Sequence, residues 1–246
     1  MKKTFSLLLA LVAVSAPASA QQVTSITASW INDSPDSGVN RDNSNANDVR
    51  VCWPGSSSTV DDPSLSSRNC SDFDLTPKRD IEDNMSGYRF MRSTVPITPT
   101  VGTAFSLGTF YHVNNPIDGT SLNSVELSLG LVIGGQTVNS NWLFSHNETN
   151  NTGNNNCCND LITISGLNAA PLNFTFGGVQ YTFSILGFGN TALTAPNSTF
   201  STVENQVNST KVWGVMNRTQ VPEPATLALV STGLLGLAGV ARRRRA

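Results

Sequence analysis

The sequence predicts an all-β fold, an antiparallel β-sandwich with long polar loops, and three features of the chain support this fold class. Apolar and polar residues alternate with a period of two in several segments, as in strands that bury one face. Glycine pairs and Asn-rich stretches separate these segments, which is typical of turns and loops. No segment of the chain's central part has the apolar periodicity of a three-turn helix. A jelly roll is one arrangement that such strands allow.

The clearest strand runs from Val125 to Ile133, where every second residue is apolar. Two further alternating runs, 172–176 and 179–185, flank the dipeptide Gly177-Gly178. Because glycine readily takes positive φ, this two-residue turn predicts a β-hairpin. Weaker alternation brings the total to about nine or ten strands. The weaker strands are expected at residues 23–30, 87–91, 105–112, 141–146, 161–164, 200–204 and 211–216.

Two long polar segments, 32–83 and 145–160, are expected to be loops. The second has seven Asn in sixteen residues. The first is rich in aspartate, and oxygen-rich loops can bind calcium. It lacks the Asp-x-Asp-x-Asp run of an EF-hand, so a solvated loop is preferred and a calcium site is the alternative. The aspartates concerned are Asp33, Asp36, Asp42, Asp48, Asp61 and Asp62.

The N-terminus has the pattern of a secretory signal peptide. Lys2 and Lys3 precede an apolar run. Ala18 and Ala20 then supply the small-x-small pattern that signal peptidase recognises. Residues 1–20 are therefore expected to be removed by signal peptidase during export.

The C-terminus consists of a Pro-Glu-Pro motif, an apolar run and a basic cluster. The run 225–241 has 17 uncharged residues, the short end of the length that spans a bilayer as a helix. The arginines would keep the C-terminus in the cytoplasm, which places residues 21–220 outside as one domain. The motif is Val221, Pro222, Glu223 and Pro224, and the cluster is Arg242, Arg243, Arg244 and Arg245.

Residues 221–246 resemble the PEP-CTERM sorting signal of Gram-negative bacteria in the order of these three parts. The resemblance implies recognition by an exosortase, a membrane cysteine protease-transpeptidase. The exosortase would cleave near the motif and transfer the body to the outer surface or to an extracellular exopolysaccharide matrix. Until then the C-terminal transmembrane helix would anchor the chain in the inner membrane. A plain tail anchor with a proline-rich stalk is the alternative.

Four cysteines of the exported body would lie in an oxidising compartment, where they allow three pairings. We favour the local disulfide Cys52–Cys70, whose loop closure would stabilise the fold by about 3 kcal/mol. Cys157 and Cys158 would then form a vicinal bridge or two free thiols. The alternative pairs each of them with one member of the first pair, which would tie the two polar segments together.

The body is acidic once both terminal segments are removed. Of 15 basic and 17 acidic residues in the chain, the body keeps 9 and 16, a net charge of −7. An acidic domain without a basic stripe argues against nucleic acid as a partner.

The two histidines are the residues most typical of acid-base or metal chemistry. If His112 and His146 converged with Glu148, they would form a site of two histidines and one carboxylate. Their separation of 34 residues fits no standard ligand spacing. We therefore expect each histidine to bond backbone at the start of a loop, with no metal and no cofactor.

Catalytic motifs are absent from the sequence, which contains no Gly-x-Ser-x-Gly, no phosphate-binding loop and no His-Glu-x-x-His. A carboxylate pair such as Glu126 and Glu204 would suit a surface hydrolase only across a cleft. A carbohydrate-binding module is the stronger alternative, because tryptophan rings can stack on sugars, although in sandwiches they are more often core. The tryptophans are Trp30, Trp53, Trp142 and Trp213.

The segments around both histidines resemble the THxN family of PEP-CTERM proteins. Residues 107–117 keep His112 and Asn114 of that family but have Tyr111 in place of its threonine. Residues 146–150 carry the second match, with Ser86-Gly87 upstream and 199–204 downstream. The resemblance implies no enzymatic role. The sequence thus predicts a non-catalytic β-sandwich for adhesion or association with a biofilm matrix, with exopolysaccharide as one candidate partner.

Overall fold

The computed structural model describes most of the body and little of the terminal segments. The predicted signal peptide and nearly all of the predicted C-terminal helix lie outside the described residues. Within the described part, no helix has the length and apolar character needed to span a membrane. The described residues are 21–34, 39–54, 70, 85–115, 121–149, 159–167, 171–219 and 233–234.

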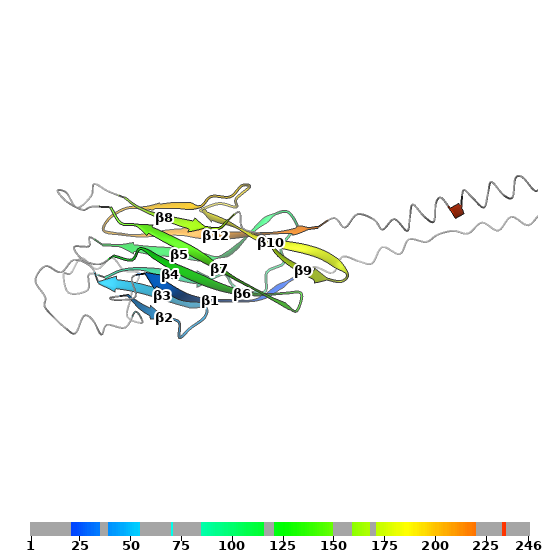
Figure 1. The fold of residues 1–246 in the computed structure, drawn as a ribbon, viewed down its shortest axis with the longest axis horizontal. Helices are drawn as coiled ribbons and strands as arrows, with labels where there is room; N and C mark the ends of the chain where they lie inside the picture. Colours follow the sequence, from blue (N-terminus) through cyan, green and yellow to red (C-terminus); the bar gives the residue numbers. More distant parts are fainter. Residues whose placement is uncertain are drawn as a thin grey trace, which may run out of the picture.

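Two antiparallel sheets form a β-sandwich, which confirms the predicted fold class (Figure 1). The five-stranded sheet has the order β1-β6-β7-β8-β11, formed by Val23–Ser34, Ser124–Ile133, Gln136–Asn147, Asp160–Ser165 and Thr199–Thr202. The seven-stranded sheet has the order β2-β3-β4-β5-β12-β10-β9, formed by Asn40–Asp42, Asp48–Pro54, Met85–Arg92, Ala104–Asn114, Gln206–Arg218, Val179–Gly189 and Leu172–Phe176. The last strand, β12, lies inside its sheet between β5 and β10.

Each strand expected from the alternating pattern is present, β9 with the expected bounds and the others with at least one end shifted. The β9–β10 hairpin is confirmed, because Phe176 pairs with Val179 across Gly177 and Gly178, whose φ angles are 55° and 76°. The largest shift is in β12, which spans thirteen residues instead of the six expected. At β11 the strand ends before Glu204, which lies in the turn to β12.

The prediction of a loop over residues 32–83 is wrong in part, because strands β2 and β3 lie within it. In β3, Val49, Val51 and Trp53 alternate along the strand and are 0% exposed. Because this alternating run is short and lies between Asp- and Ser-rich segments, the sequence pattern did not identify it as a strand. The polar strand β2 pairs with β3 alone, so packing at the sheet edge, not hydrophobic pattern, defines it.

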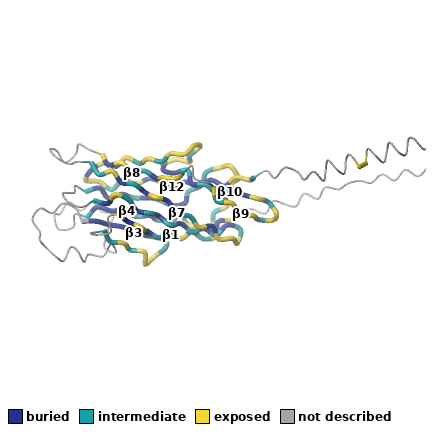
Figure 2. Tube along the Cα trace, viewed as in Figure 1, coloured by how far each residue is buried: buried dark blue, intermediate teal, exposed yellow. Residues whose placement is uncertain are grey.

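Buried residues recur along the strands of both sheets (Figure 2). They form a core between the sheets that is rich in aromatic rings. Trp30 from β1 contacts Phe110 of β5 and Phe144 of β7 at ring-centroid distances of 6.3 and 5.5 Å. All four tryptophans are buried, with at most 8% of their surface exposed. The interpretation of tryptophans as core residues is thus confirmed, and none of them presents an open ring face to sugars.

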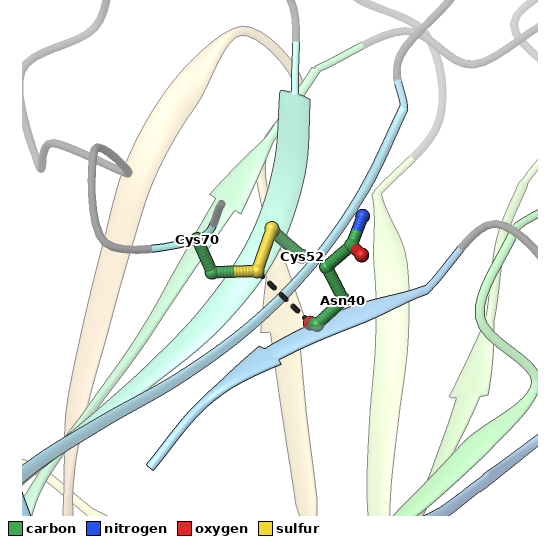
Figure 3. The surroundings of a disulfide bond; sticks show 3 residues. All are labelled: Asn40, Cys52 and Cys70. Atoms are coloured by element: carbon green, nitrogen blue, oxygen red, sulfur yellow. Dashed lines mark hydrogen bonds between the residues drawn. A yellow bond between two sulfur atoms is a disulfide. The ribbon is translucent and has the colours of Figure 1, made fainter. Parts of the chain in front are cut away.

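The disulfide Cys52–Cys70 is formed as predicted, with a Cα–Cα distance of 5.8 Å (Figure 3). Cys52 lies on β3, and Sγ of Cys70 contacts the carbonyl oxygen of Asn40 on β2 at 2.9 Å. Val113 of β5 belongs to the same buried cluster as the two cysteines. Cys157 and Cys158 lie outside the described residues. The bridge therefore fastens residue 70 to the seven-stranded sheet.

The sandwich has two distinct ends. At the first, which we call the terminal end, β1 begins and β12 finishes: Gln22 accepts a hydrogen bond from Gly134, and Thr219 donates one to Gln180. At the opposite end, the loop end, β5 finishes where β12 begins, with Asn114 paired to Gln206. The disulfide lies at the loop end, beside Val113.

A bulge in β10 should make Gly187 indispensable. Its φ is 101°, and an added Cβ would lie 1.9 Å from the carbonyl oxygen of Asn197. We expect Gly187→Ala to lower the free energy of unfolding by about 3 kcal/mol or more, because strain and overlap add. At Gly178 the φ is 76° and nothing lies within 4 Å of such a Cβ. Gly178→Ala should therefore cost only about 1 kcal/mol. Equal losses in denaturant unfolding would contradict this account.

Reduction of Cys52–Cys70 should lower the free energy of unfolding by about 3 kcal/mol, because it frees the unfolded chain from a closed loop. The measurement is denaturant unfolding with and without a phosphine reductant in a Cys157→Ser/Cys158→Ser chain, where only this bridge can be reduced. Adding Cys52→Ser and Cys70→Ser to that chain should remove the reductant effect. Unchanged stability of the first chain on reduction would refute the prediction.

Candidate functional site

Ionisable side chains from both sheets meet inside the loop end of the sandwich. The group, which we call the His–carboxylate cluster, consists of His112 at the end of β5, His146 near the end of β7, Glu148 just after β7, Asp160 at the start of β8, and Glu204 between β11 and β12. His112 and Asp160 are 0% exposed, Glu204 2% and His146 8%. A buried cluster of this composition is unusual for a domain core and marks the candidate site.

Strand alternation carries these side chains inward. On β5, Phe110 and His112 share the inner face, and on β7, Phe144 and His146 do so. Phe110 and Phe144 stack at 5.4 Å, and one step nearer the loop end the two histidine rings lie 5.2 Å apart. The inner face thus changes from apolar to ionisable residues at a single layer of the sandwich.

His146 is held by partners at both ring nitrogens. Its Nδ1 hydrogen bonds with the Tyr88 hydroxyl, and its Nε2 lies 3.1 Å from Oε2 of Glu148 and 3.5 Å from Oδ2 of Asp160. Burial raises the pKa of the Tyr88 hydroxyl well above its ordinary value, and the charges of Asp160 and Glu148 raise it further. The hydroxyl therefore keeps its proton and orients the imidazole.

His112 is held at one nitrogen only. Its Nδ1 lies 2.9 Å from the Thr202 hydroxyl, while its Nε2 is buried without a hydrogen-bond partner among the described residues. The Trp53 ring stacks on His112 at 6.1 Å and meets His146 edge-on at 5.3 Å. The expectation that both histidines bond backbone is wrong, because the partners recorded for their ring nitrogens are side chains. The less favoured alternative, convergence of both histidines with Glu148, holds in part: Glu148 contacts His146, but the carboxylate that groups with both histidines is Asp160.

The carboxylates are only partly satisfied by hydrogen bonds. Oδ1 of Asp160 accepts bonds from the backbone N–H and the hydroxyl of Thr149, at 2.9 and 3.2 Å. Both oxygens of Glu204, Oε1 of Glu148 and the Oδ1 of Asn114 are buried without a hydrogen-bond partner among the described residues. Buried acceptors in this number call for a donor or a cation.

Burial and mutual repulsion set the protonation of the cluster. Burial lowers the pKa of His112 well below its ordinary value, and neighbouring His146 lowers it further, so His112 is neutral. Burial opposes a charge on His146, but hydrogen bonds to Asp160 and Glu148 outweigh it and raise its pKa. Burial, together with the charges of Asp160 and Glu148, raises the pKa of Glu204 to about 7.

The other predicted site residues lie elsewhere. Glu126 sits on β6 and accepts a hydrogen bond from Asn32 at 3.0 Å, so it does not join Glu204 in the cluster. Asp160 was missed by sequence reasoning, as were Tyr88 and Thr202. The only sequence signal for Asp160 was an acidic residue placed directly before a strand, which is common in any loop.

Where the structure describes them, the aspartates of the first polar segment form ion pairs with arginines or accept a hydrogen bond within a turn. Asp33 forms an ion pair with Arg41 at 3.1 Å, and Oδ1 of Asp42 accepts a hydrogen bond from the backbone N–H of Ser44. Asp48 accepts two hydrogen bonds from Arg89, at 2.6 and 2.7 Å. These three give no support to the calcium alternative. The remaining ones, Asp36, Asp61 and Asp62, lie outside the described residues.

The C-terminal residues match a known sorting signal. The PEP-CTERM protein-sorting motif matches residues 220–245, which include the Pro-Glu-Pro motif and the four arginines. The motif implies an exported, cell-surface protein of a Gram-negative bacterium that an exosortase processes. No curated protein matches the chain in sequence.

Loss of the Tyr88 hydroxyl should destabilise the protein, because Nδ1 of His146 would lose its partner in a buried site. We expect Tyr88→Phe to lower the free energy of unfolding by about 1–3 kcal/mol. The matched control is Tyr111→Phe, since Tyr111 lies on the half-buried outer face of β5. This change should alter stability by less than about 0.5 kcal/mol. Equal effects of the two changes in thermal unfolding would show that the Tyr88–His146 bond contributes nothing specific.

Proposed function

We propose that this protein is a surface or matrix component whose non-catalytic β-sandwich serves adhesion or association with exopolysaccharide after an exosortase has released its tail. The observation that carries the proposal is the position of the sorting motif directly behind a complete sandwich. The last strand, β12, ends at Arg218, and the motif match begins at residue 220. Processing within the motif would therefore leave every strand of the sandwich in place.

The order of strands supports this division between cargo and signal. Strand β12 pairs with β5 from Gln206 to Val215 and with β10 from Lys211 to Arg218. A cut before Arg218 would remove part of a central strand, whereas a cut in the motif removes none. The sandwich is thus suited to survive the loss of the tail.

The geometry also favours display of the loop end. Gln22 and Thr219, which lie next to the two ends of the described body, are both at the terminal end. A body held through residues beyond Thr219 would present its opposite end to the surroundings. That end carries the disulfide and the C-terminal ends of strands β3, β5 and β7. Loops on a rigid sandwich are the usual place for recognition.

The proposal also covers the export route of the protein and its membership in a family. We include removal of residues 1–20 by signal peptidase and a transient inner-membrane anchor formed by residues 225–241. Membership in the THxN family is part of the same proposal. It is supported by the gathering of His112, Asn114 and Glu204 at the loop end, since these residues belong to the segments that carry the resemblance.

The carbohydrate-binding alternative loses its main argument, because all four tryptophans are buried. Trp213, for example, donates a hydrogen bond to the carbonyl of Gly189 and is covered by Lys211, whose Nζ lies 5.6 Å from the ring centroid. Binding to matrix polysaccharide would then depend on the polar loops, not on ring stacking.

Replacing the motif should block sorting without affecting the fold. In the native host, we expect Pro222→Ala/Glu223→Ala/Pro224→Ala to leave the tail attached and the protein in the membrane fraction. Intact mass and cell fractionation measure both effects. Gln220→Ala, one residue before Val221, is the control and should be processed normally. Release of the triple variant to the surface with the same cleaved mass would contradict exosortase sorting.

The adhesion role has its own readout. Cells that display the processed body should retain more exopolysaccharide, or attach more firmly, than cells lacking the protein. The triple variant should behave like the deletion, because its body remains at the inner membrane. Normal attachment and normal matrix in the deletion strain would refute the adhesion role while leaving the sorting role intact.

A further inference from the structure

We propose that the His–carboxylate cluster binds one divalent transition-metal ion of the zinc class through the rings of His112 and His146 and a carboxylate oxygen of Asp160. One ligand atom from each of these residues lies within 4.8 Å of the others. In a tetrahedral zinc site with bonds of about 2.1 Å, ligand atoms are about 3.4 Å apart. The three side chains therefore need to close in by roughly an ångström, within the reach of small rotamer adjustments.

The hydrogen bonds at the two Nδ1 atoms favour metal binding through both Nε2 atoms. A metal-bound histidine usually donates its other N–H to an oxygen acceptor, which fixes its tautomer and orientation. Here Nδ1 of His146 meets the Tyr88 hydroxyl, and Nδ1 of His112 meets the Thr202 hydroxyl. If each Nδ1 carries the proton, each Nε2 has a free lone pair. The Nε2 of His146 then faces Glu148 and Asp160, an arrangement that is repulsive unless a proton or a metal ion lies between these groups.

Unpartnered atoms are a second, independent sign of a ligand. His112 is completely buried, yet its Nε2 has no hydrogen-bond partner among the described residues. Both carboxylate oxygens of Glu204, which is 2% exposed, also lack a hydrogen bond of good geometry among these residues, although the Asn114 amide lies close enough to lower the pKa of this carboxyl. Among the described residues, the ion pairs of Glu148 and Asp160 are with His146 alone. Leaving such groups unpaired costs several kcal/mol, and a cation would remove that cost.

The charge of the four proposed ligands suits a divalent ion. Two neutral histidines with Asp160 and one further carboxylate carry two negative charges, which a divalent ion neutralises. Either Glu148 or Glu204 can supply the fourth ligand, because both form a second close group with Asp160. Four ligands of this kind match a structural zinc site.

The nitrogen ligands distinguish a transition metal from calcium. Calcium takes six to eight oxygen ligands, whereas the second close group offers three carboxylates, Glu148, Asp160 and Glu204. Imidazole suits zinc and its neighbours in the first transition row. The ion would also connect the two sheets, because His112 lies on β5 and His146 and Asp160 on β7 and β8. We therefore assign the ion a structural role at the loop end.

The test is zinc binding by the full-length chain, purified in detergent with a tag that contains no histidine. After chelator treatment, the chain should take up one equivalent of zinc, measured by elemental analysis and by competition with a chromophoric chelator. Zinc should raise the unfolding temperature progressively with its concentration. Cobalt in its place should give the intense visible bands of a tetrahedral site. A Cys157→Ser/Cys158→Ser chain serves as the starting protein, so that thiols cannot supply the ligands.

Asp160→Asn is the decisive variant, because it should fold. Its amide oxygen can still accept the bonds from Thr149, and its N–H can be donated to Nε2 of His146. We expect stability in chelator at least equal to that of the starting protein, but zinc affinity lower by more than about 100-fold. Removing a residue that only holds a metal ligand in place typically lowers metal affinity by about 10–100-fold. We expect a loss of that size for Tyr88→Phe, and a larger one for Asp160→Asn.

Glu126→Gln is the matched control, because Glu126 is an acidic residue on β6 that accepts hydrogen bonds from Asn32 and Asn141, outside the cluster. It should bind zinc like the starting protein. The proposal is overturned if no zinc binds. In that case the histidines and carboxylates of the cluster are stabilised by protons and hydrogen bonds alone. The proposal is also overturned if Asp160→Asn retains zinc, or if calcium or magnesium stabilises the protein and zinc does not.

Discussion

The pairing of β12 with β5 and β10 is the constraint on which the rest of the structure depends. These two ladders run almost the full length of β12 and join the hairpin β9–β10 to the strands β2–β5. Without β12 the seven-stranded sheet would fall into two pieces with new open edges. Because β12 is also the last strand before the sorting motif, the fold is completed only when the chain reaches Arg218. The sheet order therefore separates what must remain in the mature protein from what can be removed.

The loop end shows a conflict between packing and polarity that a stable sandwich normally avoids. The aromatic layer of Phe110 and Phe144 gives way within one step to two histidines and three carboxylates. Burial lowers the pKa of both histidines, but hydrogen bonds to Asp160 and Glu148 outweigh it at His146, so that His112 is neutral while His146 is more readily protonated. Such groups destabilise a core unless hydrogen bonds or a bound cation compensate. The hydroxyls of Tyr88 and Thr202 supply part of that compensation. This arrangement is better explained by a ligand than by packing alone.

Particular elements show how far sequence reasoning extends. The β9–β10 hairpin followed from alternation and two glycines, and Cys52–Cys70 from the short span between two cysteines, because both depend on local geometry. Strands β2 and β3 were missed, since one is polar and the other is short, and their pairing with β4 is what defines them. The two histidines were recognised as candidates, but their spacing argued against a shared site. Asp160 carried only the weak signal of an acidic residue directly before a strand.

The sequence by itself predicted ten of the twelve described strands and the C-terminal sorting motif and favoured the local disulfide, because period, turn chemistry and motif order act over a few residues. Only the tertiary structure decided which side chains meet at the loop end. His112 and Glu204 are brought into one cluster by the pairing of β5 with β12, and Asp160 joins them because β8 follows β7 in the opposite sheet. Alternation places a side chain on the inner face of a strand, but not opposite a given partner. That choice depends on strand order and register, which long-range packing sets.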